Sequence, residues 1–116
     1  MPITRIDVEL DVDGSCDLGP PPTISIPNQQ GSVLIVWTIV GAEFDPDHGI
    51  EITSDPDDSI TESHLIDAHH WSVVDTNDGS NTQVIAITYN INYICDANGK
   101  LVHREDPTID NQPPTG

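Results

Sequence analysis

The chain has 116 residues and a mass of 12.6 kDa, which is room for a single domain. Three basic residues against 20 acidic ones give a net charge of −17, which argues against nucleic acids and anionic membranes as partners because their phosphates carry the same sign. Ile and Val together number 24, whereas Leu, Met and Ala number only 10. This ratio argues against helical bundles and coiled coils, because branched side chains pack best on strands.

Alternation of apolar and polar side chains predicts most of the strands. Residues 5–13 place apolar side chains on one face and acidic ones on the other, as a half-buried strand does. Residues 33–40 are apolar on both faces, which predicts a strand in the middle of a sheet. Between them, the run Gly19-Pro20-Pro21-Pro22 predicts a stiff, extended crossing. Further strands are expected at residues 23–27, 50–54, 70–75, 82–95 and 100–105.

Turn-forming residues separate these strands. Residues 41–49 are expected to form a loop, residues 55–59 an acidic turn, and residues 75–81 a second turn rich in Asp, Asn and Gly. The run Asp96-Ala97-Asn98-Gly99 predicts a hairpin before the final strand, because Asn-Gly tolerates the positive φ of a tight turn.

One short helix completes the expected elements. The spacing Ser59-x-x-Glu62 resembles a capping box and predicts one or two helical turns through Ala68. No expected helix is long enough to cross between parallel strands. The fold class is therefore all-β, an immunoglobulin-like antiparallel β-sandwich of about seven strands. Residues 1–106 form this single domain, and residues 107–116 form a Pro-rich C-terminal tail that needs no ordered structure.

Three features in the second half of the chain occur in the order typical of a known family. They are the turn at Asp75 to Asn77, the hairpin at Asp96 to Gly99, and the closing segment Asp106 to Pro113. On these features residues 73–113 resemble the C-terminal half of the DP-EP family, a group of small uncharacterised bacterial proteins. The sequence departs from the family where Gln112-Pro113 replaces a Glu-Pro pair. The resemblance implies a β-sandwich and transfers no established activity.

Two acidic turns are candidate calcium sites, because calcium takes about six to eight oxygen ligands. Their candidate ligands are Asp55, Asp57 and Asp58 in the first turn and Asp75, Asn77 and Asp78 in the second. Neither turn has the EF-hand spacing of acidic residues. Asx-turns, in which an Asp side chain accepts hydrogen bonds from nearby backbone amides, explain the same residues without a cation. The sequence favours such turns and leaves a weak calcium site as the alternative.

The histidines and hydroxyl residues do not form a recognisable catalytic or zinc motif. A zinc site needs about four converging ligands, and the adjacent His69 and His70 would face opposite sides of a strand. Surface positions are therefore favoured for the five histidines, which are His48, His64, His69, His70 and His103. Neither a Gly-x-Ser-x-Gly elbow nor a Cys in a protease-like signature occurs in the sequence. The sequence predicts that the chain is not an enzyme, and the remaining alternative is a hydrolase with a His beside a Ser or Cys in a deep pocket.

Aromatic residues raise the question of carbohydrate binding, since lectin-like sandwiches stack sugars on exposed rings. Trp37 lies within a two-sided apolar strand, while Tyr89 and Tyr93 alternate with Ile, so core packing is favoured for all three. Trp71 fits either role.

The cysteines and the N-terminus bear on the location of the protein. No basic start followed by an apolar stretch is visible, so the sequence predicts a cytoplasmic protein. Free thiols at Cys16 and Cys95 are then the default, and one disulfide is the alternative. The function expected is a non-catalytic binding or structural module that uses no cofactor and contacts a protein partner or a second copy, but neither nucleic acid nor membrane. The rival function is a calcium-stabilised module for a ligand or carbohydrate.

Overall fold

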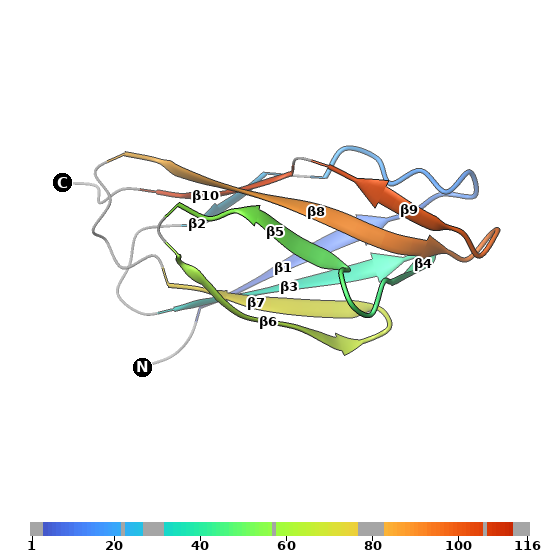
Figure 1. The fold of residues 1–116 in the computed structure, drawn as a ribbon, viewed down its shortest axis with the longest axis horizontal. Helices are drawn as coiled ribbons and strands as arrows, with labels where there is room; N and C mark the ends of the chain where they lie inside the picture. Colours follow the sequence, from blue (N-terminus) through green and yellow to red (C-terminus); the bar gives the residue numbers. More distant parts are fainter. Residues whose placement is uncertain are drawn as a thin grey trace.

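The computed structural model describes residues 4–21, 23–26, 32–56, 58–76, 83–105 and 107–112, and these ranges contain ten strands and no helix (Figure 1). None of the described segments is therefore a helix that could span a membrane. In chain order the strands are β1 (Thr4–Asp11), β2 (Ile24–Ile26), β3 (Val33–Val40), β4 (Ala42–Phe44), β5 (Ile50–Ser54), β6 (Ile60–Asp67), β7 (His70–Asp75), β8 (Ile85–Cys95), β9 (Leu101–Arg104) and β10 (Thr108–Asn111).

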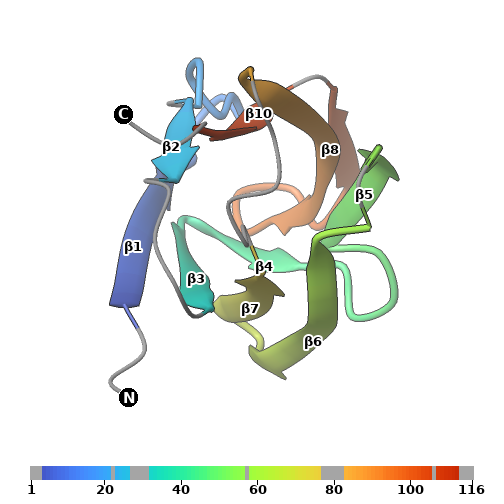
Figure 2. The same cartoon turned by 90° about the vertical axis from the view of Figure 1, so that its left-hand side faces the viewer.

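The strands form two sheets that face each other (Figure 2). The four-stranded sheet has the order β1-β3-β7-β6. The six-stranded sheet has the order β2-β10-β8-β4, and β5 and β9 also pair with the long strand β8. The expected all-β sandwich is thus confirmed, and β3 is an inner strand, as its two-sided apolar sequence predicted.

Both sheets are mixed, whereas an antiparallel sandwich was expected. β1 runs parallel to β3, in register from Thr4 opposite Val33 to Asp11 opposite Val40, and β2 runs parallel to β10. The expectation assumed that parallel neighbours need a crossover helix. Here the chain leaves β1, forms β2 in the opposite sheet and returns as β3, so the second sheet supplies the crossover.

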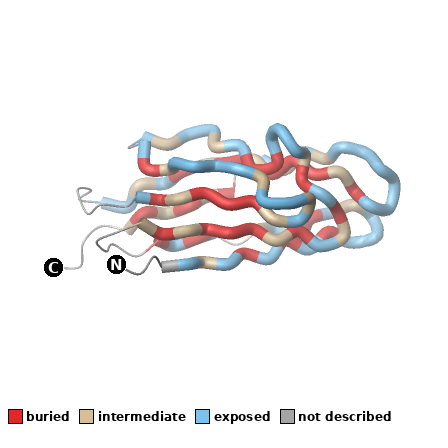
Figure 3. Tube along the Cα trace, turned by 90° about the horizontal axis from the view of Figure 1, so that it is seen from below, coloured by how far each residue is buried: buried red, intermediate tan, exposed pale blue. Residues whose placement is uncertain are grey.

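The core lies between the sheets and follows the period of two. Val8 and Leu10 of β1 are buried, while the intervening Asp7 and Glu9 are exposed. Figure 3 shows buried positions along the strands and exposed positions at the loops. Alternate residues of β8 supply five side chains to the core, each at most 1% exposed: Ile87, Tyr89, Ile91, Tyr93 and Cys95.

All five aromatic residues of the chain are buried. The Trp37 Nε1–H donates to the Tyr89 hydroxyl at 3.3 Å, and their ring centroids are 5.3 Å apart. Trp71 packs edge-on against Phe44, with centroids 6.0 Å apart. The core positions predicted for Trp37, Tyr89 and Tyr93 are confirmed, and Trp71 joins them.

The predicted helical turns after Ser59 are wrong, since residues 60–67 form strand β6. Ser59 does not cap a helix. Its amide and hydroxyl instead donate to the Asp55 carboxylate at 3.0 and 3.3 Å. β6 is an edge strand, and its pairing with β7 shifts register twice, between Thr61 and His64 and between Leu65 and Asp67. These irregularities break the alternation that would have identified the strand.

Two short strands lie where irregular chain was expected. β4, within the expected loop at 41–49, pairs with the end of β8. β10, within the expected tail at 107–116, lies between β2 and β8, and its Ile109 is fully buried. The sheet structure therefore extends beyond residue 106, and the described residues contain ten strands instead of the expected seven or so. Segments of three or four residues are too short for alternation to be recognised.

A disulfide joins Cys16 to Cys95, so the expectation of free thiols is wrong. The turn after β1 brings Cys16 against the end of β8, where Cys95 faces the core. The Tyr93 hydroxyl donates to the Cys16 carbonyl at 2.8 Å and holds the same turn in place. The default of free thiols followed from a cytoplasmic location, whereas disulfides are typical of oxidising compartments.

Candidate functional site

The first acidic turn uses the carboxylate of its first residue, Asp55, to hold its own backbone. The two Asp55 oxygens accept hydrogen bonds from the Ser59 amide at 3.0 Å and the Ile60 amide at 2.9 Å. The neighbouring Asp58 is exposed, and its amide donates to the Asp55 carbonyl. This is the Asx-turn that the sequence favoured. Asp57, the third candidate ligand of this turn, lies outside the described residues.

Asp75, the candidate calcium ligand that opens the second turn, is fully buried. Its Oδ1 accepts a hydrogen bond of 3.1 Å from the Asn111 side-chain amide, which also donates to the Ser59 hydroxyl at 3.0 Å. Asn111 thereby ties β10 of one sheet to β7 of the other. The remaining candidates, Asn77 and Asp78, lie outside the described residues.

Among the described residues no three His, Cys, Asp or Glu side chains are grouped as metal ligands. Structural hydrogen bonds account for Asp55 and Asp75, and calcium binding stays a prediction.

The histidines are distributed over both sheets. On the six-stranded sheet, His103 Nδ1 pairs with the Asn92 side-chain oxygen, and the Asn92 amide donates to the His48 carbonyl at 2.6 Å. On the four-stranded sheet, His70 Nδ1 lies 2.7 Å from an Asp67 oxygen, and the His69 amide donates to the same oxygen at 2.9 Å. Each of these histidines is held by a local polar partner.

The outer face of the four-stranded sheet contains a shallow hollow of about 510 Å³. We call it the outer-face hollow, and it is lined by Arg5, Leu34, Val36, His64, Ile66, Asp67, His70 and Ser72. Leu34 and Val36 come from β3 and Ile66 from β6, and these three side chains supply its apolar part. Val36 is only 3% exposed although its side chain points away from the core, whereas Ile66 is 52% exposed.

Charged side chains surround the apolar part of the outer-face hollow. Arg5 Nε lies 2.8 Å from an Asp7 oxygen at one side, and the Asp67–His70 pair lies at the other. The hydrogen bond with His70, followed by the one from the His69 amide, lowers the pKa of the Asp67 carboxyl below its ordinary value of 3.8. Apolar surface framed by paired charges is the usual composition of a binding site.

One part of the outer-face hollow has residues typical of hydrolases. Asp67, His70 and Ser72 line it together, and the carboxylate orients the imidazole as in a catalytic triad. Within the described chain, however, no hydrogen bond joins Ser72 to a histidine. Ser72 is 3% exposed. It belongs to the inner strand β7, where it lies opposite Val36 of β3 on one side and opposite His64 of β6 on the other. Acyl transfer needs backbone amides directed at an oxyanion, and here those amides belong to the sheet ladders.

The sequence pointed to this surface only in part. His64 and His70 were considered as zinc ligands, and the hollow itself was not predicted. The signal that could have indicated it is the two-sided apolar run at residues 33–40, which places Leu34 and Val36 on the outer face. Ile66 could not be added, because residues 60–67 were expected to be helical.

Comparison with models of known protein families gives no match, and comparison with curated proteins gives none either. The resemblance to the DP-EP family therefore stays a prediction.

Proposed function

We propose that this chain is a non-catalytic binding module that receives a protein partner on the outer face of its four-stranded sheet. The observation that supports the proposal is the outer-face hollow, in which Leu34, Val36 and Ile66 form an apolar floor in a chain that is only 35% hydrophobic. A chain with so few apolar residues to fill its core still leaves Ile66 half exposed on this face.

The chemistry of the hollow suits a partner that brings both apolar and charged side chains. A volume of about 510 Å³ lies in the range of small ligand pockets, about 300–1,000 Å³, so one or two aliphatic side chains of a partner fit into it. Arg5, Asp7 and Asp67 at the margin can pair with charges around that apolar anchor. The net charge of −17 favours encounter with a positively charged partner.

Carbohydrate binding receives no support from the aromatic residues, because all five rings are buried and none is left for sugar stacking. The immunoglobulin-like type of sandwich is part of this proposal, because binding modules are common in that fold. The DP-EP relationship is proposed beside it and transfers no activity.

The proposal is tested by selecting peptides from a random library on the wild-type chain and measuring their affinity for two variants. Ile66→Asp places a charge in the apolar floor and is expected to weaken the selected peptides by about tenfold or more, since a buried charge without a partner is costly. Leu101→Asp is the matched control, because Leu101 is a 61% exposed apolar residue on the other sheet, and it is expected to leave binding unchanged.

Thermal melting of both variants checks that the fold is retained. Peptides that bind Ile66→Asp as tightly as the wild type, or a selection that yields no binder, would contradict the proposal.

A further inference from the structure

The first strand leaves one edge of the four-stranded sheet open. β1 pairs only with β3 in the described chain, and Figure 2 shows it at the margin of its sheet. The Val12 amide donates to the Val40 carbonyl at 2.9 Å, so the backbone of Val12 points toward β3. Because backbone groups alternate in direction along a strand, the amides and carbonyls of Asp7, Glu9 and Asp11 point to the open edge.

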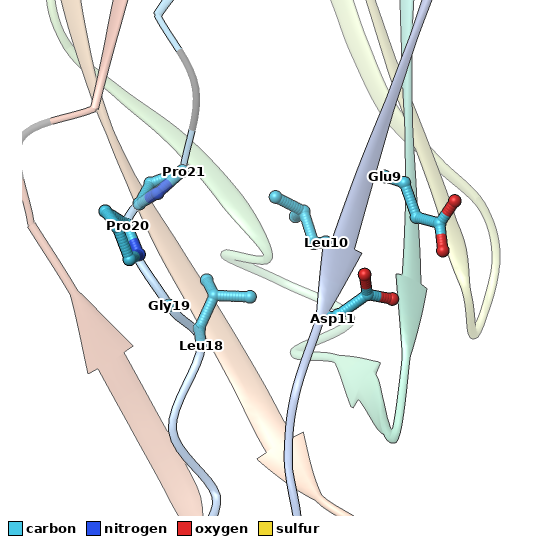
Figure 4. A pocket seen from close by; sticks show the side chains of 7 residues that line it. All are labelled: Glu9, Leu10, Asp11, Leu18, Gly19, Pro20 and Pro21. Atoms are coloured by element: carbon cyan, nitrogen blue, oxygen red, sulfur yellow. The ribbon is translucent and has the colours of Figure 1, made fainter.

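A groove of about 190 Å³ runs beside this open edge (Figure 4). We call it the edge groove. Leu10 and Leu18 form its floor and are almost fully buried, and Pro20 and Pro21 form the opposite wall. In Figure 4 the side chains of Glu9 and Asp11 point away from the groove, to the solvent side of β1.

The solvent side of β1 is acidic. Asp7, Glu9 and Asp11 follow one another at alternate positions, and Arg5 pairs only with Asp7 among them. The hydrogen bond and the like charge of Asp11 raise the pKa of Glu9, because the two carboxyl groups are neighbours on one face of the strand. A cation placed beside them would relieve this repulsion.

We propose that the open edge of β1 binds an extended peptide that alternates basic and apolar residues, by adding it as a fifth, antiparallel strand. Strand addition satisfies the backbone groups of Asp7, Glu9 and Asp11. A peptide residue opposite each of these positions has its side chain on the same solvent side, beside a carboxylate, so a basic residue belongs there. The residues between them point inward, where the edge groove accepts an aliphatic side chain.

The same charges exclude a second copy of this chain as the occupant. Antiparallel pairing of two β1 strands would set carboxylates opposite carboxylates, which destabilises a sheet, and would bring together two molecules of charge −17. The partner is therefore a basic strand from a different molecule. The edge groove and the outer-face hollow have no lining residue in common. The two proposals share only Asp7, which no variant in either test changes, so this inference does not depend on the proposed function.

The test measures binding of a synthetic nine-residue peptide of alternating lysine and valine to the full chain at an ionic strength of about 0.15 M. N-methylation of the lysines removes the amides that face β1 in the antiparallel arrangement, whereas N-methylation of the valines removes amides that face solvent, and both peptides keep the same charge. We expect the lysine-methylated peptide to bind at least about tenfold more weakly than the valine-methylated one, because it loses several backbone hydrogen bonds.

A pair of double variants tests the acidic row. Glu9→Gln with Asp11→Asn is expected to weaken the unmethylated peptide about fivefold or more. The matched control, Asp47→Asn with Asp96→Asn, removes the same charge from exposed loop residues and is expected to change affinity by less than about twofold. Equal binding of the two methylated peptides, or equal losses in the two double variants, would overturn the inference and indicate general attraction to an acidic surface.

Discussion

At the scale of single residues, the two buried phenol groups of β8 join this strand to other parts of the fold. The Tyr89 hydroxyl accepts the Trp37 indole hydrogen bond, and the Tyr93 hydroxyl donates to the Cys16 carbonyl. Burial raises the pKa of Tyr89 to about 12 from an ordinary value of 10.0. Burial, followed by the negative charge of Asp17, raises the pKa of Tyr93 as well.

The ionisation of these tyrosines is a direct test of the core, because the chain contains no other tyrosine. The pKa of Tyr89 is higher in the folded state than in the unfolded state, so its contribution to stability is complete below pH 10 and is lost as the pH rises through about 12. We expect the native protein at pH 10 to show less than half of the phenolate absorbance of the unfolded chain, because Tyr89 stays protonated until about pH 12 and the pKa of Tyr93 is raised as well. In denaturant both tyrosines should titrate near pH 10. Half-ionised phenols in the native protein at pH 10 would contradict the buried positions.

At this scale the sequence predicts which side of a strand a residue faces, but not what it contacts there. The inward positions of Tyr89 and Tyr93 follow from their alternation with Ile. The roles of Asp55 and Asp75 do not follow from the sequence. An Asp in a turn has the same sequence pattern whether its carboxylate accepts backbone amides, pairs with Asn111 or binds a cation. The distinction depends on groups that only the fold brings near.

Among the secondary-structure elements, the turn between β3 and β4 depends on one glycine. Gly41 has φ of +83°, and a Cβ atom at this position would lie 2.3 Å from the Val12 carbonyl oxygen. This turn carries the chain from the four-stranded sheet into the six-stranded sheet. A side chain at position 41 would therefore have two effects at once: it would strain the backbone and displace Val12.

Comparing two glycine variants separates these effects. Gly99→Ala, at φ of +69° with open space around the added Cβ, is expected to cost about 1–2 kcal/mol from backbone strain alone. Gly41→Ala adds the clash with Val12 and is expected to cost about 3 kcal/mol or more. Denaturant unfolding with unchanged m-values measures both. Equal losses would show that Val12 moves aside without cost.

The elements recovered from sequence are those with uninterrupted patterns. Residues 33–40, 50–54 and 70–75 were predicted with the bounds that the structure shows. β4 and β10 were missed because they are short, and β6 because its register shifts disrupt the pattern. The parallel pairings were missed because alternation indicates the buried face of a strand but not its neighbour. For the outer-face hollow, the apolar row of Leu34 and Val36 could therefore be predicted from the sequence. The opposite side of the hollow, formed by Ile66, could not.

Over the whole molecule, the disulfide closes most of the chain into one loop. Cys16 and Cys95 are 79 positions apart, and their bond fastens the turn after β1 to the end of β8. Sequence separation carries no information on distance in space, so the pairing could not be predicted. In the chain-entropy model a loop of this length restricts the unfolded state strongly.

Reduction of this bond is therefore expected to destabilise the protein substantially. We expect reduction, or the double variant Cys16→Ser with Cys95→Ala, to lower the free energy of unfolding by about 2–5 kcal/mol. Denaturant unfolding with and without a thiol reductant measures the difference. The double variant is the control for incomplete reduction, and it should show no further response to the reductant. An unchanged midpoint in the wild type would mean that the thiols are not joined.

The place of β10 also determines when the protein can finish folding during its synthesis. β2 is made early, yet in the described chain it pairs only with β10, which is translated more than eighty residues later. At about 5–20 residues per second, several seconds pass on the ribosome before the backbone of β2 can pair with β10. The nascent chain thus leaves the hydrogen-bonding groups of its second strand without this partner until residues 108–111 have been made, and a chaperone has that interval in which to bind.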